Sequence, residues 1–270
     1  MKRSFISLTS DFGVGTRGIG MMHASALDIC PEAHVIDLRH GLKGFSATEG
    51  AYALESAKFL PVGCHVCVVD PEVGTERKGI IIKTKRGDYL IGPDNGVLIP
   101  AAERFLGGIE KAVAIENDKY MRKPVSPVFH GRDVFTPAAA WLCRGVEISE
   151  FGPEINPKDL VRAPYEEAEV SKGLVSGKII HVNHYGSVFI NARQEDFAKS
   201  EIRYKDDVLI ETGNKKIKTK FLKTFGEVRK GDVVMFPDDC GRIEIAINMG
   251  NFSKEFGTKL LDKVKIRKCE

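Results

Sequence analysis

Three short polar segments, each following an apolar run, carry side chains that could do chemistry. "TSDFG" contains Asp11, and "VVDPEVGTERKGI" places Asp70 at a predicted strand end with Arg77 beyond a tight turn. "PVSPVFHGRDVFTPAAAW" places His130 just before a helix expected to begin near Asp133. Because strand-end loops of a parallel sheet converge on one crevice, we expect these polar groups to gather there as a functional site.

Each of these residues also has an ordinary structural explanation. Asp133 could cap a helix, Arg77 could form a surface ion pair, and His130 could be a hydrogen-bonded loop histidine. The combination favours function, because a loop that carries these groups between prolines is polar where packing would require apolar residues.

A literal G-x-G-x-x-G at residues 13–18 precedes Asp37, which ends another apolar run, "HVIDL". This is the pattern of a dinucleotide-binding turn. In that fingerprint the first glycine follows the strand directly, whereas residues 10–12 intervene here. The carboxylate of Asp11 would repel a pyrophosphate, but it can accept a hydrogen bond from each of two neighbouring ribose hydroxyls. Asp11 therefore indicates sugar binding, with a helix-capping aspartate as the alternative.

The composition is that of an ordinary globular protein, with 270 residues, 43% hydrophobic and 29% charged. A net charge of +3 is too small to indicate nucleic acid or an anionic membrane as the main partner. No apolar run approaches bilayer length and the N-terminus has no signal-peptide pattern, so we expect a cytoplasmic protein. The basic stretch "NKKIKTKFLKTFGEVRKGD" is interpreted as a hairpin with lysines on its solvated edge, because an oligonucleotide-binding barrel usually needs clustered aromatics.

The six cysteines are scattered and require no disulfide. Cys64 and Cys67 resemble a metal pair, but "CHVCVVD" has the composition of a buried strand. Residues three apart on a strand point to opposite faces, so this pair is not expected to share a metal, and no other ligand cluster is evident.

The chain is predicted to form an α/β domain with a mostly parallel sheet over residues 1–165 and an antiparallel β-barrel over residues 166–270. A linker rich in proline and charge follows Phe151. In the first domain we expect strands at residues 5–9, 34–38, 65–70, 79–84, 89–92 and 111–115. We expect helices at residues 20–30, 46–59, 97–105 and 133–144.

Five motifs together resemble the S-adenosyl-L-methionine hydrolase (adenosine-forming) family, hydroxide adenosyltransferases related to fluorinating and chlorinating enzymes. They are "TSDFG", "VVDPEVGTERKGI", "LIGPDNGVL", "FHGRDVFTPAAA" and "GRIEIAINMGN", and they span almost the whole chain. The resemblance implies an N-terminal α/β domain, a C-terminal β-barrel and a homotrimer whose active sites lie between subunits. It also implies that water attacks the ribose C5′ of S-adenosylmethionine, giving adenosine and methionine with no cofactor or metal.

The resemblance further implies that Asp70, Arg77 and His130 are the water-activating residues. In this scheme the guanidinium stabilises developing hydroxide, while the carboxylate or the imidazole takes the proton. The halogenating relatives lack this set, so its presence favours hydrolysis over halogenation.

The remaining site residues also come from the resemblance. Asp11 would hold the ribose diol, and Phe12 beside it is expected among the substrate-binding residues. Phe129 would lie near the reacting carbon, and Tyr185 would stack on adenine. The backbone around Asn248 would read the adenine edge.

The chain departs from the family pattern at the methionine end of the substrate. Asn183 stands where the family has an acid that pairs with the substrate ammonium, and Ser187 replaces an asparagine. Residues 238–241 are "DDCG" where N-S-x-G is common, and Thr16 stands where an aspartate is common. We hypothesise that Asp239 supplies the lost carboxylate from the other side.

Other functions stay open on sequence grounds. The altered methionine end also fits a non-catalytic binder of adenosine or S-adenosylmethionine, or an enzyme acting on another 5′-substituted adenosine. A nicotinamide-dependent oxidoreductase rests on the glycines alone, and a halogenase is disfavoured by Asp70, Arg77 and His130.

Overall fold

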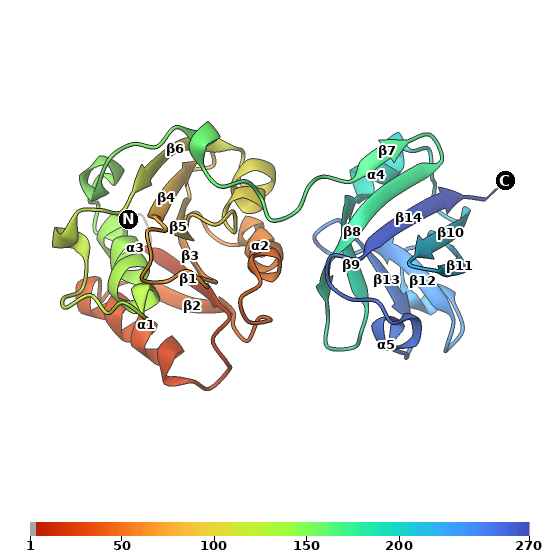
Figure 1. The fold of residues 1–270 in the computed structure, drawn as a ribbon, viewed down its shortest axis with the longest axis horizontal. Coiled ribbons are helices and arrows are strands. Elements are labelled where there is room, and N and C mark those ends of the chain that lie inside the picture. The colour runs from red at the N-terminus through yellow and green to blue at the C-terminus, as the bar shows by residue number, and fades with distance from the viewer. Residues whose placement is uncertain (1–3, 270) are drawn as a thin grey trace. The chain divides into compact units, whose positions relative to one another are not determined.

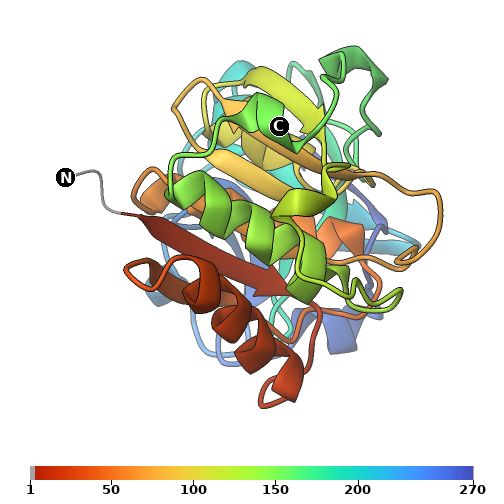
Figure 2. The same ribbon diagram turned by 90° about the vertical axis from the view of Figure 1, so that its left-hand side faces the viewer.

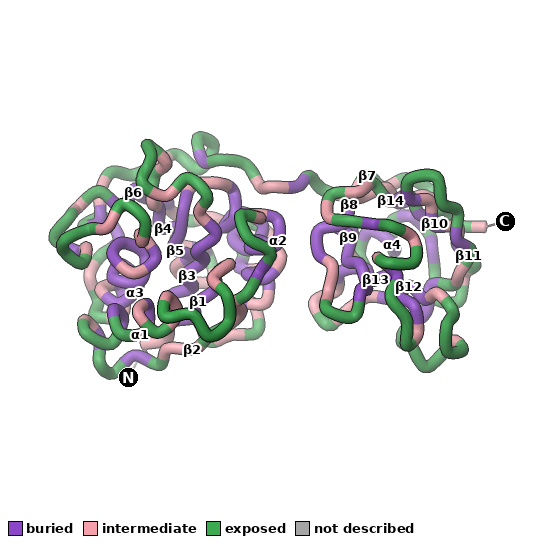
Figure 3. The backbone as a smooth tube through the Cα atoms, turned by 60° about the horizontal axis from the view of Figure 1, so that its bottom comes forward, coloured by how far each residue is buried: buried purple, intermediate pink, exposed green. Residues whose placement is uncertain are grey.

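The computed structural model describes residues 4–269 and divides into two compact units, one ending at Pro164 and one beginning at Tyr165 (Figure 1). Among these residues, no helix is long and apolar enough to cross a membrane. Figure 3 shows buried stretches in the strands of both units and, in the N-terminal unit, in helices α2 and α3 as well.

The N-terminal unit is built on a six-stranded sheet in the order β2-β1-β3-β5-β4-β6. All strands run the same way except β4, which is antiparallel to both of its neighbours, so the predicted mostly parallel sheet is confirmed. The strands are β1 Phe5–Ser10, β2 His34–Arg39, β3 Cys64–Val68, β4 Gly79–Thr84, β5 Tyr89–Pro93 and β6 Ile109–Ala114.

The helices of this unit lie where apolar periodicity predicts them, with different boundaries. The helix predicted over residues 46–59 is α2 followed by a 3-10 turn, and the one predicted over residues 133–144 is a π turn followed by α3. The helix predicted over residues 97–105 is short and ends in a π turn. The bounds are α1 Arg17–Ile29, α2 Ala47–Leu54, α3 Thr136–Cys143, and π turns Gly131–Phe135 and Ala101–Phe105.

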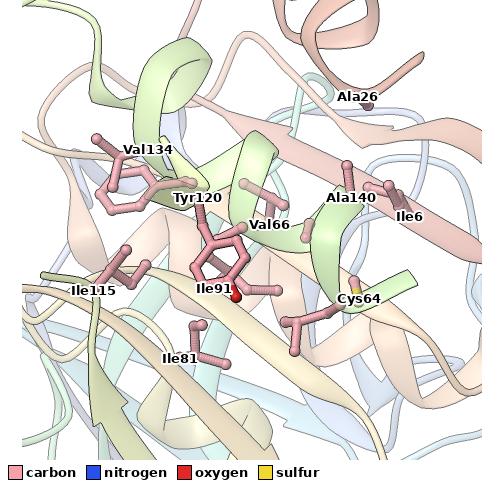
Figure 4. Close-up of a cluster of buried hydrophobic side chains, with 14 of the residues drawn as sticks. Ile6, Ala26, Cys64, Val66, Ile81, Ile91, Ile115, Tyr120, Val134 and Ala140 are labelled. Carbon is pink, nitrogen blue, oxygen red and sulfur yellow. The ribbon is translucent and has the colours of Figure 1, made fainter. Parts of the chain in front are cut away.

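Helices α1 and α3 cover one face of the sheet, as Figure 2 shows in front of β1. The core beneath them joins Ile6, Val66 and Ile91 of the strands to the small residues of α3, such as Ala140 (Figure 4). Helix α2 packs against β1 and β3. Its Gly50 lies so close to Val69 that an added Cβ would be 2.9 Å from a Val69 methyl carbon, so the helix approaches at this position only without a side chain.

The C-terminal unit is an eight-stranded antiparallel sheet curled into a nearly closed barrel, which confirms the predicted fold class. An isolated bridge from Phe221 to Met235 brings the two ends of the sheet together. The strands are β7 Glu169–Ser171, β8 Leu174–Val182, β9 Val188–Arg193, β10 Asp207–Thr212, β11 Lys215–Lys220, β12 Val233–Pro237, β13 Arg242–Ile247 and β14 Lys263–Lys268, with short helices α4 Gln194–Lys199 and α5 Phe252–Phe256.

Two smaller expectations are also confirmed. The lysine-rich segment supplies strand β11, which pairs with β10 in a hairpin, and its lysines are exposed. On β3, the Cys64 sulfur lies 3.9 Å from the Cys143 sulfur, whereas Cys67 reaches the Gly50 carbonyl of α2. The two cysteines therefore point to opposite faces of the sheet.

Candidate active site

The structure brings Asp70, Arg77 and His130 into one hydrogen-bonded cluster. Asp70 follows the end of β3, Arg77 precedes β4, and His130 immediately precedes the π turn before α3. Arg77 Nε donates to Asp70 Oδ1 at 3.0 Å, and Nη2 donates to Asp70 Oδ2. The same Nη2 lies 3.1 Å from His130 Nδ1. The guanidinium therefore joins a carboxylate and an imidazole that lie 60 residues apart in the chain.

Burial controls the electrostatics of this cluster. The side chains of Asp70 and Arg77 are each only 4% exposed. Burial raises the pKa of Asp70, although the Arg77 charge opposes the shift. Burial and the Arg77 charge together lower the pKa of His130. The imidazole is thus neutral at neutral pH, and because its Nδ1 accepts from Arg77, its proton is on Nε2.

Aromatic and ionic contacts hold the cluster in place. The guanidinium of Arg77 lies 5.4 Å from the Phe135 ring centre, and the His130 ring meets the same ring edge-on at 6.4 Å. The fully buried carboxylate of Asp133 pairs with Arg132 and accepts the Ser126 backbone N–H at 2.9 Å. Asp133 therefore fixes the loop that carries His130.

Asp11 lies one residue beyond β1, and its backbone N–H donates to the Val68 carbonyl of β3 at 3.3 Å. One of its carboxylate oxygens accepts the Phe45 N–H at 2.9 Å. Phe45 was not predicted as a site residue. Its backbone is left-handed (φ 63°), a strained conformation for a phenylalanine. The residue is also 78% exposed. A left-handed phenylalanine leaves no sequence signal, so only the fold could identify it.

Phe12 and Phe129 connect the Asp11 loop to the His130 loop. Their rings meet edge-on at 5.7 Å. A Cβ added to Gly18 would lie 3.1 Å from a Phe12 ring carbon and 3.6 Å from the Phe129 ring. The last glycine of the G-x-G-x-x-G pattern therefore makes room for this aromatic pair, which gives the motif a purpose unrelated to pyrophosphate binding.

In the C-terminal unit, Asn183 shapes the loop between β8 and β9. Its side-chain oxygen accepts the backbone N–H groups of Tyr185 and Ser187 at 3.0 and 2.9 Å. The Tyr185 ring is 75% exposed and is available for stacking. An aspartate at position 183 could accept the same two bonds, so the amide changes the charge of the loop and keeps its turn.

Asn248 is tied to the 228–232 turn. Its side chain donates to the Val228 carbonyl, and its backbone N–H and C=O pair with Asp232 and Gly231. The exposed, left-handed residue beside it is Met249. If the backbone here reads an adenine edge, the groups that follow Asn248 are better placed than its own.

Asp239 is exposed in the turn after β12, near an acid that the sequence did not single out. Glu244 of β13 is 7% exposed and accepts a hydrogen bond from Ser187. Burial, together with the charges of Asp238 and Asp239, raises the pKa of Glu244 to about 7. The only signal in the sequence is an acid between isoleucines in "GRIEIAIN".

The Glu244→Gln variant should be more stable than the parent above neutral pH. Because the folded-state pKa of about 7 exceeds the ordinary value of 4.5, folding is penalised once pH rises past 4.5, and the full penalty applies above 7. Near pH 8 the gain should be about 1 to 3 kcal/mol, and near pH 4.5 it should vanish. Thermal unfolding at both pH values, with the exposed Glu255→Gln as control, measures this difference; an equal gain at both would contradict it.

Among residues 4–269, no three His, Cys, Asp or Glu side chains are grouped so that they could hold a metal ion.

Comparison with known proteins connects this geometry to a family. Residues 6–152 match the family model described as the SAM hydroxide adenosyltransferase N-terminal domain, and residues 177–265 match the corresponding C-terminal domain. Relatives named (R)-S-adenosyl-L-methionine hydrolase from Methanocaldococcus jannaschii and Salinispora tropica are 33% and 31% identical, each alignment covering 97% of this chain and 95% and 97% of the relative.

A more distant relative and a solved structure are also similar to this chain over nearly its whole length. A fluorinase from an Actinoplanes species is 24% identical, with 94% of each chain covered. The crystal structure of an uncharacterized conserved protein from Thermotoga maritima superposes with a TM-score of 0.90 at 32% identity, covering 97% of this chain and all of that one. The chain belongs to the SAM hydroxide adenosyltransferase family.

Proposed function

We propose that this protein hydrolyses S-adenosyl-L-methionine to adenosine and L-methionine. The observation that carries the proposal is the buried Asp70–Arg77–His130 cluster, in a chain whose full-length relatives are named as hydrolases of this substrate. Incubation with S-adenosylmethionine should yield adenosine and methionine in equal amounts, measured by chromatography. No adenosine above the enzyme-free blank would leave only a binding protein.

The reaction needs a positioned nucleophile but no acid for the leaving group. A water oxygen forms a bond to C5′ while the C5′–S bond breaks. The electron pair of the C5′–S bond goes to the sulfonium sulfur, which becomes the neutral thioether of methionine. One water proton passes to the Asp70 carboxylate and then to solvent. The raised pKa of Asp70 suits it to accept that proton at neutral pH.

Arg77 and His130 would orient the water and stabilise its developing charge. The guanidinium is held by Asp70 and His130 and packed over Phe135, so little reorganisation is needed during the reaction. With Nδ1 facing Arg77, the neutral imidazole presents Nε2–H as a donor. In this arrangement Asp70 is the better base, and His130 holds the water in line.

As the family resemblance implies, the substrate would be held between subunits of a homotrimer. Asp11 has one carboxylate oxygen bonded to Phe45, and the other can accept from the ribose diol. The Phe12–Phe129 pair would form an apolar wall near C5′. The exposed Tyr185 ring would stack on adenine, and the backbone after Asn248 would contact its edge. The turn of Asn183 would place the stacking ring.

Asp239 would pair with the substrate ammonium, replacing the acid missing at position 183. The Asp239→Ala variant should raise the KM for S-adenosylmethionine about 10-fold or more, with kcat changed less than about twofold, because this contact is made equally in the ground and transition states. Steady-state kinetics, with the exposed Glu255→Ala as control, tests it. An unchanged KM would reject the relocated acid.

The altered methionine end also supports a second candidate, an enzyme acting on another 5′-substituted adenosine. Calorimetry with S-adenosylmethionine and methylthioadenosine separates the two: tighter binding of methylthioadenosine would favour the second. We also propose a cytoplasmic homotrimer, as the family resemblance implies, and light scattering should give the mass of three chains.

A further inference from the structure

The Asp11 loop is anchored by a chain of hydrogen bonds that starts at Ser10. Ser10 is the last residue of β1 and is fully buried. Its hydroxyl oxygen accepts the Phe12 N–H at 3.2 Å, so a hydrogen bond joins the two residues that flank Asp11 in the sequence. The same hydroxyl lies 2.6 Å from His40 Nδ1.

The chain continues through His40 to Asp37. His40 Nε2 lies 3.0 Å from Asp37 Oδ1, and the His40 side chain is 5% exposed. A carboxylate accepts only, so Nε2 carries the imidazole proton and Nδ1 is left to accept the Ser10 hydroxyl proton. The Ser10 lone pairs are then free to accept from Phe12. Each donor has one acceptor, and the order is fixed from Asp37 to the Asp11 loop.

Asp37 is suited to be the terminal acceptor of this series of hydrogen bonds. Burial acts to raise its pKa, but hydrogen bonds from His23 and His40 outweigh that effect and lower it. His23 Nε2 reaches the same Asp37 oxygen at 2.6 Å from helix α1. His23 is therefore a second partner of Asp37 that lies outside the route to Ser10.

Further bonds join the two loops around Asp11. The Gly41 N–H donates to the Phe12 carbonyl at 2.8 Å, one residue beyond His40. The Phe45 N–H donates to the Asp11 carboxylate from the same segment. The segment after β2 thus bonds to the Asp11 side chain directly, to the Phe12 backbone on one side of it and to the Ser10 hydroxyl on the other.

Ser10, His40 and Asp37 occur in the order of a nucleophilic triad, but the burial of Ser10 argues against that chemistry. Ser10 is 0% exposed and its oxygen is already used by the Phe12 N–H. Ser7, His65 and Asp88 repeat the same atom pattern, and all three of these residues are fully buried. In this unit the arrangement serves to lock strand ends and loops.

We propose that Ser10, His40 and Asp37 form a positioning relay that sets the Asp11 carboxylate for the ribose diol, and so determines selection for the intact ribose. The proposal rests on the proposed role of Asp11. The relay residues touch backbone and one another, so their effect on the ligand passes through Asp11.

The test compares binding of adenosine with that of 2′,3′-dideoxyadenosine, which lacks the diol, by calorimetry. His40→Ala and Ser10→Ala should weaken adenosine binding about 10-fold and leave the dideoxy nucleoside within about twofold. His40→Asn keeps an acceptor near Ser10 and should recover much of the loss. His23→Gln, which loses only the other partner of Asp37, should behave as the parent protein.

The outcomes separate the relay from the function on which it rests. If the parent protein binds both nucleosides equally, the role of Asp11 is wrong. If the parent prefers adenosine and the Ser10 and His40 variants keep the full preference, the relay is wrong. Equal weakening of both nucleosides would show a general structural role and would also overturn the proposal. Ser10→Ala removes a single oxygen, so it keeps the test decisive if His40→Ala fails to fold.

Discussion

Replacing Arg77 with lysine should lower kcat for S-adenosylmethionine hydrolysis by about 100- to 1,000-fold. A lysine keeps the positive charge but cannot donate in parallel to both Asp70 oxygens and also reach His130 Nδ1, as the guanidinium does. The water would lose its oriented donors while the substrate-binding groups stay in place. Adenosine binding should therefore change less than about threefold, measured by calorimetry beside the kinetics.

A matched control is available in the same unit. Arg86 makes a similar two-pronged contact with Asp88, its Nε and Nη2 lying 2.7 and 2.8 Å from the carboxylate oxygens. Arg86→Lys should lower the unfolding temperature and leave kcat within about twofold. If both variants lose activity equally, or if Arg77→Lys keeps the parental kcat, the proposed catalytic cluster is incorrect.

Replacing Asp11 with asparagine should weaken adenosine binding about 100-fold. A hydrogen bond to a charged acceptor contributes about 1.5 to 3 kcal/mol, and the ribose diol would lose the charge at both of its contacts. Asparagine has nearly the same shape and its oxygen can still accept the Phe45 N–H. The loss should therefore come from recognition and not from unfolding.

Calorimetry with adenosine measures this loss, and Asp28→Asn, an exposed acid on α1, serves as the control. The Asp11→Asn variant should bind 2′,3′-dideoxyadenosine, which lacks the diol, as tightly as the parent protein does. Undiminished adenosine binding by the Asp11 variant would remove the ribose from its proposed place and reopen the question of what the carboxylate does.

Much of the fold could be predicted because its signals are local. Apolar runs such as "HVIDL" and "CHVCVVD" gave the parallel strands, and short β-like runs separated by turns gave the barrel. Boundaries moved where the backbone took unusual turns. The helix predicted from Asp133 begins as a π turn at Gly131, a choice that side-chain periodicity does not encode.

The positions of Asp70, Arg77 and His130 next to predicted elements indicated that they gather at one edge of a parallel sheet, and the family resemblance singled them out as the water-activating set. Glu244 and Phe45 could not be predicted in this way. Burial of Glu244 depends on the cross-strand neighbours Phe189 and Phe236, and Phe45 reaches Asp11 only through the left-handed backbone of its loop. Such contacts depend on tertiary structure, which composition and spacing do not specify.

The central claim, that a water activated by Asp70, Arg77 and His130 attacks the ribose C5′, is tested most directly by isotope labelling. The reaction is run with S-adenosylmethionine in ¹⁸O-enriched water, and the products are analysed by mass spectrometry. Our account predicts adenosine carrying one ¹⁸O at its 5′-hydroxyl, and unlabelled methionine. Adenosine without the label, or release of adenine in place of adenosine, would contradict it.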